Sequence, residues 1–174
     1  MIRTFQPADL TAVMQIWLNA NLKAHNFIPA DYWKNHFEHV KKLLPDAELY
    51  VYEEPPASLY GFIGMAGDYI AGIFVEENAR SKGIGKQLLD HAKSLRQNLT
   101  LNVYQKNERA VSFYLREGFR IHSQAEEDCT NETEYFMKWR SADLKFPAAS
   151  LEAAAPPRSS LPPDTIRKRP DALP

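Results

Sequence analysis

Apolar residues in the first 140 positions recur with two spacings, one typical of helices and one typical of strands. Spacings of three and four residues predict helices over residues 9–23, 29–44, 83–95 and 108–117. Short apolar or alternating runs predict strands over residues 2–5, 48–53, 59–66, 69–75, 99–103, 119–123 and 134–139. The early strands follow one another as hairpins, so the pattern predicts an α+β (mixed α/β) fold rather than a doubly wound parallel sheet.

This pattern ends near residue 141. Seven of the twelve prolines lie between Pro147 and Pro174, whereas every glycine lies at or before Gly118. No helical or strand period runs through the proline-rich stretch, so we expect one folded domain over residues 1–140 and a disordered tail over 141–174. The basic run at 167–169 is a candidate docking element, and a solvated tail without a role is the alternative.

The charge balance gives no sign of a polyanionic partner. Lysine and arginine number 21 against 22 acidic residues, and binding to nucleic acid or an anionic membrane requires a clustered basic surface. We therefore expect no nucleic-acid and no membrane partner. Cys129 is the single cysteine, which excludes an internal disulfide and favours a reducing compartment. Without a long apolar run or a signal-peptide layout, the sequence predicts a cytoplasmic protein.

One strand–loop–helix segment, residues 73–89, has the composition of an anion-binding cradle. Its loop places Arg80, Gly83 and Gly85 in the pattern Arg-x-x-Gly-x-Gly. Glycines let the backbone approach a ligand closely, and the first amides of the following helix have no partners within it and suit a pyrophosphate. The Walker A pattern fails at Gln87, and the dinucleotide pattern fails at Leu88. Taken alone, the segment is equally consistent with an ordinary strand-to-helix turn.

A second segment, residues 107–119, follows the strand predicted at 99–103. Asn107 stands at the expected N-cap position of the next helix. Ala110, Phe113 and Tyr114 then fall on neighbouring positions of one helix face. A core position is the alternative role for Tyr114. The two segments together are more informative than either one.

Together these segments resemble the GNAT family of acyl-CoA-dependent N-acetyltransferases. The family motif Arg/Gln-x-x-Gly-x-Gly/Ala is matched by Arg80, Gly83 and Gly85. Its following motif, Asn-x-x-Ala-x-x-(apolar)-Tyr-x-x-x-Gly-Phe, is matched by Asn107, Ala110, Phe113, Tyr114, Gly118 and Phe119. Over residues 2–139, the resemblance implies a GNAT-like fold with a central, mostly antiparallel sheet of about 6–7 strands and about four flanking helices. It also implies parallel strands that splay apart at the cofactor site.

Within that family, the chain is similar to the small bacterial YiaC and YjaB type. The shared features include Trp17, the run His25-x-Phe27-Ile28 and Tyr-Gln-Lys-Asn at 104–107. That type is linked to the acetylation of protein lysines. The resemblance therefore implies acetyl-CoA as co-substrate and direct attack by an amine in a ternary complex.

The resemblance also implies roles for the motif residues. Tyr114 would donate a proton to the departing thiolate, because a free thiol has a pKa of about 8.5 and leaves more readily beside a donor. Ile73 and Val75 would offer backbone groups to the pantetheine arm, and Asn107 would contact that arm through its amide. The pyrophosphate would be held by the loop and helix start, formed by Arg80, Ser81, Lys82, Gly83, Ile84, Gly85 and Lys86.

The acceptor side has weaker signals. In the family, the turn between the first two helices walls the acceptor site, and core packing is the alternative for its residues. The candidates there are His25, Phe27, Tyr32, Trp33 and His36. Tyr69 could line the same slot or fill the core. Glu76 and Glu77 could serve as the base or remain solvated loop acids, and the histidines do not form a metal-ligand spacing with acids.

The expected function is acetyl transfer to a primary amine, either a protein lysine or an N-terminal amine. A non-catalytic acyl-CoA sensor and a small-molecule amine acetyltransferase are the alternatives. Tyr114 favours catalysis, because a pure binder needs no thiolate donor. A toxin-type enzyme that acetylates aminoacyl-tRNA requires a basic face, which the net charge of −1 disfavours. The sequence is compatible with a monomer or a homodimer.

Overall fold

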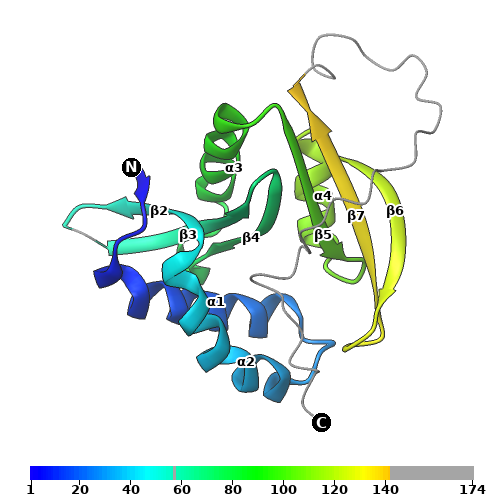
Figure 1. The fold of residues 1–174 in the computed structure, drawn as a ribbon, viewed down its shortest axis with the longest axis horizontal. Helices are drawn as coiled ribbons and strands as arrows, with labels where there is room; N and C mark the ends of the chain where they lie inside the picture. The colour runs from blue at the N-terminus through cyan, green and yellow to red at the C-terminus, as the bar shows by residue number, and fades with distance from the viewer. Residues whose placement is uncertain (57, 142–174) are drawn as a thin grey trace.

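Seven strands and four α-helices make up the described part of the chain, residues 1–56 and 58–141 of the computed structural model (Figure 1). The strands are β1 (Ile2–Thr4), β2 (Glu48–Glu54), β3 (Ser58–Ala66), β4 (Tyr69–Val75), β5 (Asn98–Tyr104), β6 (Arg120–Glu127) and β7 (Glu132–Arg140). The helices are α1 (Leu10–Ala24), α2 (Ala30–Leu43), α3 (Ile84–Leu95) and α4 (Glu108–Arg116). The expected α+β fold is confirmed, while the tail predicted from sequence lies, beyond Ser141, outside the described residues.

The sheet is mixed, and its parallel pair lies in its interior. The strand order is β1-β2-β3-β4-β5-β7-β6. β4 and β5 run parallel and pair at Tyr69↔Thr100 and Ile70↔Leu101, whereas the other described neighbours are antiparallel. Beyond Ile70 the two strands continue without pairing to each other. They therefore splay apart toward their C-terminal ends, as expected, and open the sheet in its middle.

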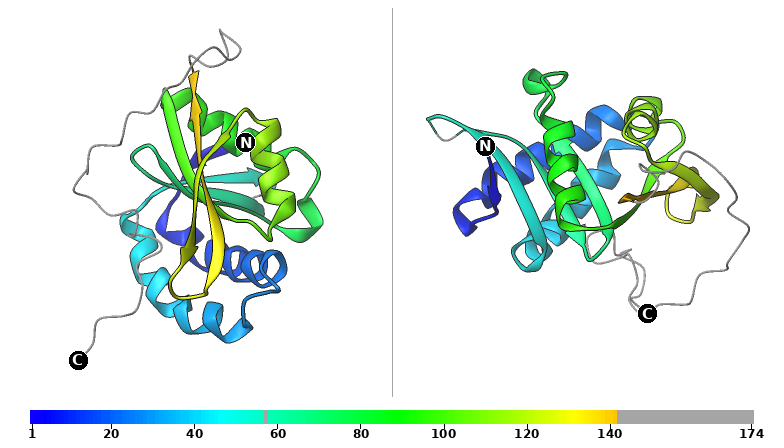
Figure 2. Two further views of the ribbon diagram at one scale, coloured as in Figure 1. Left: turned by 90° about the vertical axis from the view of Figure 1, so that its right-hand side faces the viewer. Right: turned by 90° about the horizontal axis from the view of Figure 1, so that it is seen from above.

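Helices cover both faces of the sheet (Figure 2). On one face, α1 and α2 bury residues such as Met14 and Trp33; on the other, α3 and α4 bury residues such as Leu88. Successive strand residues point to opposite faces of the sheet, so Phe62 packs in the core under α1 and α2, whereas Ile63 packs in the core under α3 and α4. The sheet opening thus lies between two buried hydrophobic cores, whose packing positions the groups around it.

Element boundaries differ from the sequence prediction by one or two residues in most cases and by more in β6. The apolar pattern predicts a strand over 119–123, whereas β6 extends to Glu127, which pairs with Glu132. Residues 124–127 are polar apart from one alanine, so no apolar alternation marks them; backbone pairing to β7 continues the strand. Cys129 lies in the hairpin loop that follows, as the sequence predicts.

None of the described helices has the length and apolar character needed to cross a bilayer. Within the same residues, the histidine, cysteine and acidic side chains form no group of three or more that could hold a metal ion.

Candidate active site

The start of α3 presents a row of backbone amides. Gly83 is the N-cap residue, with φ 81° and ψ 2°, a left-handed conformation that a Cβ atom disfavours. The Gln87 amide donates to the Gly83 carbonyl at 3.0 Å. The amides of Ile84, Gly85 and Lys86 precede that bond and have no carbonyl partner within the helix. They lie at the positive end of the helix dipole, which favours an anion there.

A cavity of about 440 Å³, here the large cavity, lies in front of these amides. The ends of α1 and β4, the loop before α3 and the inner face of α4 form its walls. It brings together nine of the ten residues that the sequence assigned to the cofactor: Ile73, Val75, Arg80, Ser81, Gly83, Ile84, Gly85, Lys86 and Asn107. The exposed Lys82 does not line it, because its side chain leaves the loop on the solvent side.

Cationic side chains surround the large cavity. Arg80 donates from Nε to the Val75 carbonyl at 3.4 Å, and Arg109 donates from Nη2 to Ser81 Oγ at 3.2 Å. Lys86 pairs with Asp90 and Glu117, each at 3.0 Å, and these hydrogen bonds raise the pKa of its ammonium group. Arg80 and Arg109 are therefore less neutralised than Lys86 at the large cavity, and their guanidinium groups complement a polyphosphate.

Sequence reasoning gave no cavity role to three residues of α4 that line the large cavity. They are Arg109, Phe113 and Arg116, which follow one another at spacings of four and three. Residues at these spacings share one helix face. Phe113 already stood on the predicted face with Ala110 and Tyr114, and steps of four residues back and three residues on from Phe113 find the two arginines.

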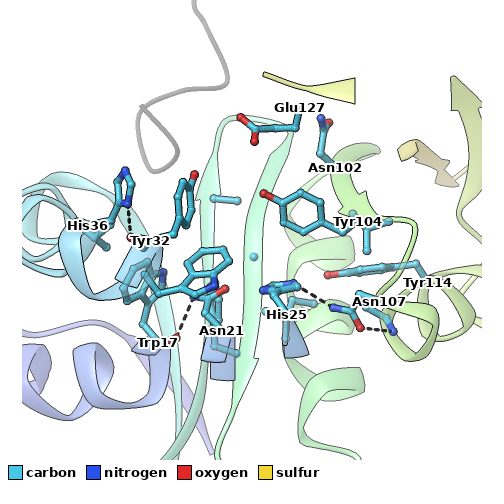
Figure 3. A pocket seen from close by; sticks show the side chains of 18 of the residues that line it. Trp17, Asn21, His25, Tyr32, His36, Asn102, Tyr104, Asn107, Tyr114 and Glu127 are labelled. Carbon is cyan, nitrogen blue, oxygen red and sulfur yellow. Dashed lines mark hydrogen bonds between the residues drawn. The ribbon is translucent and has the colours of Figure 1, made fainter. Parts of the chain in front are cut away.

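A second cavity, of about 150 Å³, occupies the gap between β4 and β5 (Figure 3). This small cavity has aromatic and imidazole walls, formed mainly by Trp17, His25, Tyr32, Trp33, His36 and Tyr104. The His25 ring is stacked on Trp33, with centroids 5.1 Å apart, and meets Tyr104 edge-on at 5.2 Å. Asn102 and Glu127 supply polar groups from the opposite side. The expectation of an aromatic pocket beside the turn between α1 and α2 agrees with this arrangement.

The two cavities meet at a shared set of residues. Both are lined by Asn21, His25, Ile73, Phe74, Asn107, Ala110 and Tyr114. The Tyr114 side chain is buried, with 7% of the residue exposed, and its ring packs edge-on against Phe113 and Phe119. Figure 3 shows its hydroxyl directed into the gap that also receives the Tyr104 hydroxyl. A donor in one cavity and an acceptor in the other would therefore meet beside the Tyr114 phenol.

Asn107 holds two elements of this junction together. Its Oδ1 accepts a hydrogen bond from the Ala110 amide at 3.3 Å, which caps α4 as the sequence predicts. Its Nδ2 lies 3.3 Å from Nε2 of His25, which comes from the end of α1. One amide thus connects the helix that carries Tyr114 to the wall of the small cavity.

Two residues that the sequence proposed for the acceptor lie elsewhere. Tyr69 lines neither cavity, because β4 is still paired with β5 at that residue and the gap opens only beyond Ile70. Phe27 lies behind the wall, edge-on to His25 at 5.8 Å and to Tyr104 at 5.7 Å, so it supports the pocket rather than lining it.

The two candidate bases also lie outside the junction. Glu77 forms an ion pair with Lys23 across the end of α1, which lowers the pKa of its carboxyl group. Glu76 and Glu77 both line a separate cavity beside α1, and neither lines the large or the small one. β4 ends at Val75, and Glu76 and Glu77 belong to the turn and short 3-10 helix that follow, so the two acids lie beyond the opening although they are close to it in sequence.

The comparisons with known proteins agree with this geometry. Residues 45–121 match the family model described as an acetyltransferase (GNAT) domain. Peptidyl-lysine N-acetyltransferase YiaC of Escherichia coli K12 is 37% identical over 141 residues, which cover 80% of this chain and 96% of that protein. Peptidyl-lysine N-acetyltransferase YjaB of the same strain is 32% identical, covering 73% and 86%.

A solved structure shares the fold over the same region. The solution structure of the apo form of YjaB from E. coli superposes with a TM-score of 0.72 at 28% identity, covering 79% of this chain and 95% of that one. Family motifs, sequence relatives and fold therefore agree over the part of the chain that builds the two cavities. The chain belongs to the GNAT family of N-acetyltransferases, which use acetyl-CoA as the acyl donor.

Proposed function

We propose that this protein transfers the acetyl group of acetyl-CoA to the side-chain amine of a protein lysine. The observation that carries the proposal is the pair of cavities that meet at Tyr114. In this arrangement the large cavity holds the coenzyme and the small cavity holds the acceptor. Both are occupied at once, so the amine attacks directly in a ternary complex.

The residues of the large cavity suit the coenzyme. Its diphosphate would lie on the amides of Gly83 to Lys86, with Arg80 and Arg109 balancing its charge. Ile73 and Val75 pair with β3 on one side, whereas the edge of β4 toward β5 is unpaired at these residues. Their backbones would add strand-like hydrogen bonds to the pantetheine arm along that edge. That arm would bring its thioester, the acyl-donating group, to the junction.

Tyr114 then serves as the acid. The amine nitrogen forms a bond to the thioester carbonyl carbon, the carbon–sulfur bond breaks, and the sulfur leaves as a thiol with the phenol proton. The nitrogen gives its own proton to water, and a proton from solvent restores the phenol. No covalent intermediate on Cys129 is needed, and that residue lies in the β6–β7 hairpin loop and lines neither cavity.

The small cavity supports a side-chain-sized acceptor. Its volume of about 150 Å³ is well below the roughly 300–1,000 Å³ of pockets for drug-sized molecules. Aromatic walls such as Trp33 and Tyr104 suit the methylene chain of a lysine and attract its ammonium group before it loses a proton. Two relatives, YiaC and YjaB, are named as peptidyl-lysine N-acetyltransferases.

An acceptor screen with acetyl-CoA tests the proposal. The panel contains lysine peptides with acetylated N-termini, lysine-free peptides with free N-termini, a polyamine and an aminoglycoside, and the release of coenzyme A is measured. We expect turnover with the blocked lysine peptides and an added acetyl group on lysine by mass spectrometry. Turnover confined to the other acceptors contradicts the lysine assignment. Coenzyme binding by calorimetry without turnover on any acceptor indicates a sensor instead.

A further inference from the structure

The small cavity has one acidic wall residue, Glu127, which the proposed reaction does not use. Among the described residues that line this cavity, it is the only carboxylate, and no lysine or arginine lies beside it there. It stands at the last position of β6, where the hairpin to β7 begins, and is half-buried. A lone carboxylate in an aromatic cavity is a binding feature for a cation.

The Glu127 carboxylate is held by its own hairpin rather than by a basic side chain. Its Oε2 accepts hydrogen bonds from the Thr130 amide at 2.9 Å and from Thr130 Oγ1 at 2.7 Å. Burial raises the pKa of Glu127, but the hydrogen bonds from Thr130 and Cys129 outweigh burial, and the pKa lies below its ordinary value. In the described residues, no ion pair neutralises this charge. The cavity therefore carries a fixed negative charge at neutral pH.

This charge lies away from the place where acetyl transfer would occur. Tyr114 and Asn107 line both cavities, whereas Glu127 lines only the small one. Figure 3 shows the Tyr104 ring between the Glu127 carboxylate and the Tyr114 phenol. An amine placed beside Tyr114 would leave Glu127 facing another part of the acceptor.

We propose that Glu127 is a specificity-determining residue that binds a second positive charge on the acceptor. The inference rests on the proposed function and sharpens it: preferred acceptors carry a cationic group close to the amine that is acetylated. In a protein, that group is an arginine or lysine side chain next to the acceptor lysine. In a small molecule, it is the second ammonium group of a diamine.

The decisive variant is Glu127→Gln, because its amide oxygen still accepts from Thr130 while the charge is removed. Glu126→Gln is the matched control: it makes the same charge change one residue earlier, on an exposed side chain that does not line the cavity. Two blocked peptides serve as acceptors, identical except that arginine or citrulline flanks the single lysine, and a third with glutamate at that position is added for Glu127→Lys. Pentane-1,5-diamine and pentylamine form a second pair.

We expect the natural protein to favour the arginine peptide by about tenfold in kcat/KM, the effect typical of a partly buried charged contact. Glu127→Gln should abolish that preference, mainly through KM, and Glu127→Lys should reverse it in favour of a glutamate-flanked lysine. Glu126→Gln should behave like the natural protein. Equal losses on both peptides, or no change in the preference, overturn the inference. If no peptide is acetylated, the lysine assignment fails, and the diamine pair still tests Glu127.

Discussion

Asn107 faces Nε2 of His25 with its amide nitrogen, because its oxygen is already committed to the Ala110 amide. An Asn nitrogen only donates, so Nε2 of His25 must be the acceptor, and the ring proton then lies on Nδ1. His25 stacks on Trp33 and touches Tyr104. The cap of α4 therefore also fixes the tautomer of a ring that lines both cavities.

Replacing Asn107 with aspartate separates these two tasks. Aspartate caps a helix about as well as asparagine, so thermal stability should stay nearly unchanged. A carboxylate cannot donate to His25, and we expect the ring proton to move to Nε2. Nitrogen-detected NMR of the imidazole should show this change of tautomer. In a thiol-release assay, kcat/KM should fall by about tenfold.

Asn107→Ala provides the comparison, since it loses the cap as well and should destabilise the protein by about 1 kcal/mol. An unaltered His25 spectrum in Asn107→Asp would contradict the assigned hydrogen bond.

Tyr114→Phe should remove the acid while preserving the packing of the ring against Phe113 and Phe119. We expect kcat to fall by about 10²–10⁴-fold, the usual effect of a positioned acid, with little change in coenzyme affinity. Thiol release measures the first quantity and calorimetry the second. A variant that keeps more than half of its turnover would remove Tyr114 from the proposed chemistry.

Gly83→Ala should weaken coenzyme binding and stability together. Gly83 has φ 81°, and a Cβ atom there meets no neighbour within 4 Å, so the cost comes from the backbone conformation, about 1–2 kcal/mol. Gly67→Ala is a matched control with φ 60° and equally open surroundings, but it lies in the β3–β4 turn, outside both cavities. Both variants should lose similar stability by denaturant unfolding. Only Gly83→Ala should raise the Kd of coenzyme A.

The donor side could be predicted from sequence because its groups are local. Gly83, Gly85 and the α3 amides come from one loop, and Tyr114 follows Asn107 by two helical turns. The acceptor side depends on distant segments that only the sheet brings together. Glu127 reaches the cavity because β6 continues past its apolar residues, and Tyr69 misses it because the β4–β5 gap opens further on. Neither fact leaves a periodic signal in the chain.

The N-terminal ion cluster predicts how stability depends on pH. Arg3 binds the Asp9 carboxylate through two nitrogens, at 2.7 and 3.0 Å, and the backbone amide of Gln6 donates to the same carboxylate at 2.8 Å. The Arg3 hydrogen bonds lower the pKa of Asp9 against the opposing effect of burial, and the Gln6 bond adds to the decrease. A group with a depressed pKa stabilises the fold when it is ionised. Its contribution is complete above the unfolded pKa of about 3.9 and disappears as the pH falls through the lower folded value.

Asp9→Asn should therefore lower the melting temperature at pH 7, by the equivalent of about 1.5–3 kcal/mol for hydrogen bonds to a charged group. The difference from the natural protein should begin to shrink below about pH 4, where Asp9 of the unfolded chain takes up a proton, and should keep shrinking as the pH falls toward the lower pKa of the folded protein. Melting temperatures between pH 7 and pH 3 measure it, with the exposed Asp46→Asn as control. Because Asp9 lines neither cavity, turnover per folded molecule should not change. A difference that stays constant over this range would mean that the Asp9 charge does not stabilise the fold.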